Sequence, residues 1–102
     1  MAVLVVMEQK GDTQELLKKY DIVSQHMMQS GMPPAELIGH FCIETPDGIR
    51  VSNVWETEAA ATAGMNDPRL IEGFKKAGMP ESTPQMMKIH NHFITSEMKA
   101  GV

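Results

Sequence analysis

The sequence predicts an α+β fold with its elements in the order strand, helix, strand, strand, helix, strand. First, residues 2–8 (AVLVVME) form a continuous apolar run rich in β-branched side chains, which is typical of a strand buried on both faces. Second, residues 37–56 read as two strands joined by a turn. Third, residues 12–30 and 57–78 carry helix start and stop signals. This order is typical of a ferredoxin-like domain, a four-stranded antiparallel sheet with two helices on one face.

The first helix is expected to begin after Asp12 and to end near Ser30. Asp12 and Glu15 are three residues apart and resemble a capping box. An apolar stripe at helical spacing would pack the helix on the sheet through Leu16, Tyr20, Val23 and Met27. Gly31 can take the left-handed conformation that follows a helix, and two prolines then keep the connection out of regular structure.

A hairpin turn is expected at residues 45–48, read Thr-Pro-Asp-Gly. Proline suits the φ near −65° of a type I turn, and glycine suits the left-handed position that closes a three-residue loop. Thr45 would then pair with Ile49, and Glu44 would face Arg50. Because opposite charges meet across the strands, this register is favoured over its neighbours.

This register gives the hairpin two different faces. The face expected beneath the helices carries Phe41, Asn53 and Trp55, and the opposite face carries His40, Cys42 and Ser52. Two helices can cover only one face of the sheet, and the other face is partly apolar. We therefore expect a homodimer in which two sheets meet face to face.

The second half of the chain predicts more helix and a last strand. Thr57 would cap an alanine-rich helix over 58–65, and Asp67 with Pro68 would start another that ends at Gly78. The inward side chains of this helix would be Leu70, Ile71 and Phe74.

A last strand is expected over residues 85–95. It would carry Asn91 on its apolar face and both His90 and His92 on the other. Residues 96–102 form a polar tail, so one domain over 1–102 would have an ordered core of about residues 2–95.

The composition excludes several classes of protein. The net charge of −4, without a basic stripe, argues against nucleic-acid binding. The apolar run at the start is too short for a membrane span. It also lacks the basic residues that precede the apolar region of a signal peptide. One cysteine excludes an internal disulfide, which favours the cytoplasm. Ten methionines indicate adaptable core filling and pocket lining.

Residues 48–60, GIRVSNVWETEAA, resemble the antibiotic-biosynthesis-monooxygenase-like group of the dimeric α+β barrel proteins. Pro-Pro followed by Leu-Ile-x-His at 33–40, and His-Asn at 90–91, are similar to a subgroup of short bacterial barrel proteins without known activity. The resemblance covers residues 2–95. It implies a homodimer that binds a small molecule, in a fold that hosts oxygenases, cyclases, isomerase-like enzymes and proteins without activity.

Two branches of the resemblance can be compared with this chain by position. Haem-degrading members carry a tryptophan nine residues after the Val-Trp tryptophan and a histidine ten residues further on. Gly64 and Phe74 stand there, which disfavours haem degradation, and we expect no cofactor. The cofactor-independent quinone-forming oxygenases use a tryptophan, an asparagine and a basic residue, and Trp55, Asn53 and His40 are of these types.

His40 and His90 are the candidate catalytic residues, because imidazole titrates near neutral pH and can transfer protons in a closed pocket. The alternative for His40 is a structural hydrogen bond at the dimer interface. The residues expected to bind the substrate are Trp55, Asn53, Phe41, Asn91 and His92. For Trp55 the alternative is an ordinary place in the core.

Three functions remain open from the sequence. The first is a cofactor-independent monooxygenase, or a cyclase or isomerase, acting on a small apolar or aromatic compound. The second is a non-catalytic ligand-binding or assembly dimer. The third is a metal site made by His90 and His92 with His40 as a third ligand.

Overall fold

The computed structural model describes residues 1–93 of the chain. Its elements in chain order are β1 (Val3–Lys10), α1 (Thr13–Gln29), β2 (Leu37–Thr45), β3 (Gly48–Trp55), α2 (Glu58–Met65), α3 (Pro68–Ala77) and β4 (Gln85–Lys88). The strands pair in the antiparallel order β2-β3-β1-β4. The predicted α+β ferredoxin-like fold is therefore confirmed.

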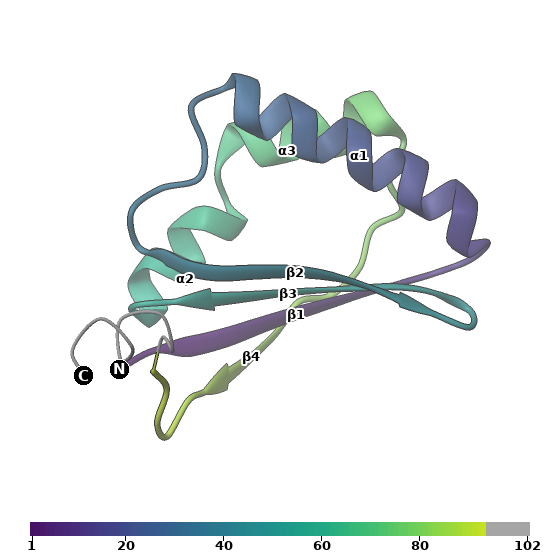
Figure 1. The fold of residues 1–102 in the computed structure, drawn as a ribbon. Coiled ribbons are helices and arrows are strands. Elements are labelled where there is room, and N and C mark those ends of the chain that lie inside the picture. Colours follow the sequence, from purple (N-terminus) through teal and green to yellow (C-terminus); the bar gives the residue numbers. More distant parts are fainter. Residues whose placement is uncertain (94–102) are drawn as a thin grey trace, which may run out of the picture.

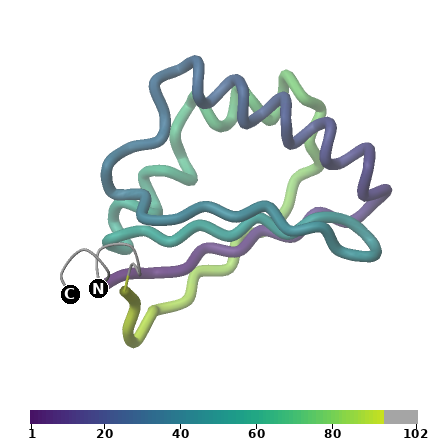
Figure 2. The backbone as a smooth tube through the Cα atoms, viewed as in Figure 1, coloured from purple at the N-terminus to yellow at the C-terminus, as the bar shows by residue number. Residues whose placement is uncertain are grey.

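The helices form a layer on one face of this sheet (Figure 1). α1 and α3 lie side by side in that layer, and Nη1 of Arg69 ties them together by donating to the carbonyl of Ser30 at 3.0 Å. Figure 2 shows the same two layers as a tube, with the short α2 near the end of the sheet where β3 ends. Within residues 1–93 there is no helix with both the length and the apolar character needed to cross a membrane.

Each helix begins at the capping residue that the sequence predicts. The side chains of Asp12, Thr57 and Asp67 each accept a hydrogen bond from a backbone N–H two or three residues later, at 2.9–3.0 Å. These bonds satisfy donors that the first turn of a helix leaves without a partner. Gly78 ends α3 with a φ of 66°, in the left-handed region that favours glycine.

The hairpin turn is one residue shorter than predicted. Thr45 pairs with Gly48, so the loop holds two residues and the predicted pairing of Thr45 with Ile49 is wrong. A Cβ at Gly48 would stand 1.9 Å from the carbonyl oxygen of Gln9, so β1 approaches the turn too closely for any other residue. Arg50 bonds across to Glu8 of β1 at 2.6 and 2.9 Å, instead of facing Glu44.

This shift of one residue turns β2 over relative to β3, because side chains alternate between the two faces of a strand. His40 and Cys42 lie on the face of the sheet that the helices cover. Phe41 lies on the face away from the helices, with 55% of its surface exposed. The prediction had these three residues the other way round. Asn53 and Trp55 lie beneath the helices, as predicted.

β4 is much shorter than the predicted last strand. β1 begins at Val3, which pairs with Lys88, so residues beyond Ile89 have no strand opposite them. Asn91, expected on a buried face, is exposed, and so are the histidines on either side of it. The end of the predicted strand, from residue 94, and the predicted polar tail lie outside the described residues.

The buried core consists of two groups of side chains. One contains Val3, Val5, Trp55 and Ala61, and the other contains Met7, Leu16, Ile49 and Val51. Leu70 and Phe74 of α3 are partly buried, as predicted, but Ile71 is 47% exposed and does not face inward.

The face of the sheet away from the helices is largely apolar. Among residues 1–93, no helix covers it. Its large exposed side chains are Phe41, Ile43 and Met87, and alternation along β1 and β3 adds Leu4, Val6 and Val54. These six side chains are called the open face below.

Candidate functional site

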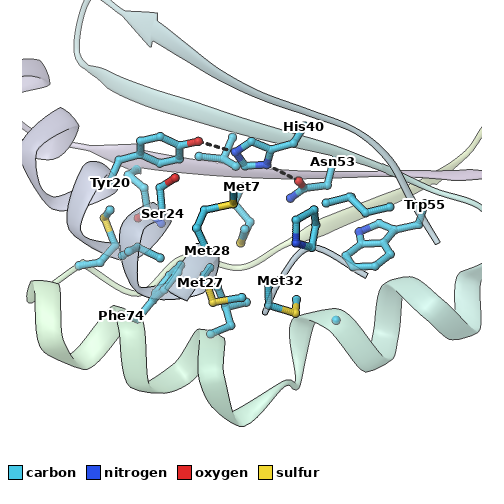
Figure 3. A pocket seen from close by; sticks show the side chains of 18 residues that line it. Met7, Tyr20, Ser24, Met27, Met28, Met32, His40, Asn53, Trp55 and Phe74 are labelled. Carbon is cyan, nitrogen blue, oxygen red and sulfur yellow. Dashed lines mark hydrogen bonds between the residues drawn. The ribbon is translucent and has the colours of Figure 1, made fainter. Parts of the chain in front are cut away.

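A cavity of about 210 Å³ lies between the sheet and the helix layer (Figure 3). The strands β1, β2 and β3, the helices α1, α2 and α3 and the connection after α1 all contribute to its wall. Five lining side chains are methionines, as the composition predicts: Met7, Met27, Met28, Met32 and Met79. Because methionine is flexible and polarisable, such a wall adapts to the shape of an apolar ligand.

The cavity opens to solvent near the end of α1 and the first half of β2. Met28, Pro33 and His40 all line it, and all three are exposed. The opening therefore has apolar side chains on one side and an imidazole on the other.

A chain of hydrogen bonds joins Tyr20, His40 and Asn53 at this cavity (Figure 3). The hydroxyl of Tyr20 is bonded to Nε2 of His40, and Nδ1 of His40 lies 2.5 Å from Oδ1 of Asn53. With the amide oriented in this way, Oδ1 can only accept, so Nδ1 carries the proton. In the tautomer that carries Nδ1–H, Nε2 accepts a hydrogen bond from the Tyr20 hydroxyl.

The fold positions each member of this chain. His40 and Asn53 are opposite one another in the pairing of β2 with β3, so their side chains are neighbours on one face. Tyr20 comes from the middle of α1, and its ring is within 10° of parallel to the imidazole, with the ring centres 5.8 Å apart.

Burial raises the pKa of Tyr20, and the neighbouring Cys42 and Asp21 raise it further. Its hydroxyl therefore stays protonated at neutral pH and is available to donate. The pKa of the Cys42 thiol is also raised, first by burial and then by Asp21 and Glu44. A raised pKa disfavours the thiolate, which is the reactive form of a cysteine.

Trp55 is both a core residue and a wall of the cavity. Its surface is only 6% exposed, and it packs with Val3, Val5 and Ala61. A Cβ at Gly64 would stand 2.4 Å from Cη2 of the indole, so the ring fits beneath α2 only because residue 64 is glycine. Trp55 therefore has the place in the core that was its alternative, and it also lines the cavity; its binding of a substrate stays a prediction.

The other predicted site residues are not brought to the cavity. His90, Asn91 and His92 are exposed beyond the end of β4, and Phe41 lies on the open face. Over residues 1–93, no group of three or more histidine, cysteine or acidic side chains could hold a metal ion. The three histidines considered as metal ligands are thus not assembled in this part of the chain.

The sequence did not predict that Tyr20 belongs to the hydrogen-bonded chain at the cavity. Tyr20 was assigned only to the apolar stripe of the first helix. A tyrosine within such a stripe has a polar hydroxyl that needs a partner when it is covered, and this was the available signal. The partner, His40, was placed on the wrong face by the error of register. A hairpin with a two-residue loop would have paired His40 with Asn53.

Solved structures that share this fold include those of antibiotic biosynthesis monooxygenases and related oxygenases. No family model matches the chain, and no curated protein matches it in sequence. The likeness is therefore one of structure, and it agrees with the resemblance found in residues 48–60.

Three of these structures illustrate the likeness. A monooxygenase from the gene ActVA-Orf6 of Streptomyces coelicolor, in complex with nanaomycin D, is 16% identical with a TM-score of 0.68 over 91% of this chain and 90% of that one. SnoaB, a cofactor-independent oxygenase from Streptomyces nogalater, is 13% identical with a TM-score of 0.61 over 89% and 94%. A proposed antibiotic biosynthesis monooxygenase from Chloroflexus aurantiacus is 10% identical with a TM-score of 0.62 over 92% and 99%.

Proposed function

We propose that this protein is a cofactor-independent monooxygenase that oxidises a small phenolic compound with molecular oxygen. The observation that carries the proposal is the hydrogen-bonded chain of Tyr20, His40 and Asn53 at an otherwise largely apolar cavity. The imidazole of His40 can supply a base, and the apolar wall suits an aromatic ring. The structural neighbours include a cofactor-independent oxygenase, which supports this class of reaction.

The first step is removal of the phenolic proton. The substrate hydroxyl donates its proton to the oxygen of Tyr20, which passes its own proton to Nε2 of His40. The imidazolium that forms keeps its Nδ1–H on the oxygen of Asn53. The amide nitrogen of Asn53 points into the cavity (Figure 3) and can donate to the phenolate oxygen.

The phenolate then reacts with oxygen at the ring carbon opposite its hydroxyl. A carbon–oxygen bond forms, and one proton converts the product to a hydroperoxide. The O–O bond breaks as the ring C–H proton and hydroxide leave together as water. One phenol and one O₂ thus give one quinone and one H₂O, so no external reductant is needed.

The test compares His40→Ala with His90→Ala, in assays of oxygen consumption and quinone formation on a panel of one- to three-ring phenols. Removing the base should lower kcat/KM roughly 10²- to 10⁴-fold. The His90 variant should keep wild-type activity, because that side chain is exposed and away from the cavity. Equal rates for His40→Ala and wild type would contradict the assignment, and binding without turnover in the wild type would identify a ligand carrier.

The open face supports a second proposal, that two copies pair sheet to sheet. Phe41, Ile43 and Met87 are 55, 45 and 43% exposed, and apolar side chains in such a group are normally covered by a partner. Cys42, a free thiol, is consistent with a cytoplasmic location.

A further inference from the structure

Gln9 is a buried polar residue that takes no part in the hydrogen-bonded chain of Tyr20. It lies near the end of β1, lines the cavity, and is only 3% exposed. Its Nε2 donates to the hydroxyl of Ser82 at 3.1 Å. Its Oε1 is buried and has no hydrogen-bond partner within the described residues.

An amide oxygen in this position is unusual, because buried polar groups are nearly always hydrogen-bonded. The amide nitrogen donates to Ser82, and the amide oxygen has no partner among the described residues. A donor brought by a ligand would complete the pairing. No acid, base or metal chemistry is required of Gln9, because an uncharged amide only accepts or donates a hydrogen bond.

Asn53 and Gln9, two of the polar residues that line the cavity, lie at different positions along the sheet. Asn53 pairs with Val5, and Gln9 is four residues further along β1, a separation of about 13 Å at strand spacing. Met7 lies between them on the same face and lines the cavity. The sheet side of the wall thus has an amide at each of these two positions and a flexible methionine between them.

We infer that Gln9 is a specificity-determining residue that accepts a hydrogen bond from a hydroxyl at the far end of the substrate. The substrate class is then an elongated aromatic compound with a hydroxyl at each end. One hydroxyl meets Tyr20 and Asn53, and the other reaches Oε1 of Gln9. This inference rests on the proposed function, since it takes the cavity as the substrate site.

The test measures binding by calorimetry without oxygen, so it does not depend on turnover. Three probes differ at one end only: 2,6-dihydroxynaphthalene, 2-naphthol and 6-methoxy-2-naphthol. The wild type should bind the diol about 5- to 10-fold more tightly than 2-naphthol, the usual effect of one net hydrogen bond. The methoxy compound should lose this advantage, because an ether oxygen cannot donate. Equal affinities for the diol and either other probe would overturn the inference.

Gln9→Leu should remove the preference for the diol while it leaves the affinity for 2-naphthol within about twofold. A preference that survives in this variant would also overturn the inference. The comparison of ligands in the wild type stands even if the variant does not fold. If the protein prefers the diol but consumes no oxygen, the proposed monooxygenase activity is refuted and the role of Gln9 is supported. If it oxidises both phenols without preferring the diol, the activity is supported and the role of Gln9 is refuted.

Discussion

Asn53 decides which nitrogen of His40 can act as the base. Its oxygen accepts from Nδ1–H, and this leaves the lone pair of Nε2 directed at the hydroxyl of Tyr20. Without that contact the imidazole could adopt the other tautomer, with a proton on Nε2 and no acceptor for Tyr20. In the proposed reaction Asn53 would therefore act twice, by fixing the tautomer and by offering its amide nitrogen to the substrate.

Replacing Asn53 by aspartate should change the pH dependence of the reaction. A carboxylate beside Nδ1–H stabilises the imidazolium relative to the neutral ring. In the proposed reaction the neutral ring accepts the proton, so the acidic limb of kcat/KM against pH should move to higher pH.

Asn91→Asp is the matched control for this change, because Asn91 is exposed and does not line the cavity. Its acidic limb should coincide with that of the wild type. If both variants shift the limb equally, the effect is one of net charge and does not come from the contact between residue 53 and His40.

At the scale of elements, the cavity depends on how closely α2 lies over the end of β3. Residue 64 of α2 touches the indole of Trp55, and only a glycine leaves room for it. Alanines give this helix other small side chains, and one of them, Ala61, is fully buried against the same ring. The indole of Trp55 can therefore pack directly against the backbone of α2.

Gly64→Ala should push the indole out of its position and into the cavity. In an unhindered helix this change would stabilise the protein by about 1 kcal/mol, whereas overpacking costs about 1–3 kcal/mol. We expect a net loss of stability, with a shift in the fluorescence of Trp55, the sole tryptophan of the chain. Urea unfolding and emission spectra measure the two effects.

Ala63→Gly, at an exposed position of the same helix, gives the effect of helix propensity alone. It should destabilise the protein by about 1 kcal/mol and leave the emission spectrum unchanged. A Gly64→Ala variant that is more stable than the wild type, with the wild-type spectrum, would show that α2 moves aside easily.

The helices were predictable from the sequence because their signals are local. A capping residue such as Asp12, Thr57 or Asp67 accepts a hydrogen bond from a backbone N–H two or three residues away. A helix start can therefore be predicted without knowing the contacts of the rest of the chain. The fold class followed from the order of these elements. These local signals do not determine which residues of two paired strands lie opposite one another.

Register is different because it depends on contacts that are distant in sequence. The two-residue turn is compatible with the close approach of Gln9 to Gly48, and Arg50 is paired with Glu8 of another strand. Neither contact can be read from residues 37–56 alone. The site was therefore only half predictable: Trp55 and Asn53 were found on the correct face, and His40 was found on the wrong one.

At the scale of the whole molecule, β2 connects the cavity with the open face. His40 and Phe41 are consecutive on this edge strand, and consecutive side chains point to opposite faces. A partner that packs on Phe41 would hold in place the strand that carries His40. The proposed dimer would therefore also order the opening of the cavity.

Phe41→Lys should separate this dimer into single chains, because it places a charge within the proposed apolar contact. We expect dimerisation roughly 30-fold weaker or more, which corresponds to the ~2 kcal/mol of an interface hot spot. Ile71→Lys is the matched control: it also replaces a large exposed apolar side chain, 47% exposed against 55%, but on α3. Sedimentation velocity over a range of concentrations distinguishes the variants. A Phe41→Lys protein that sediments like the wild type would place the interface elsewhere, and an Ile71→Lys protein that dissociates would place it on the helices.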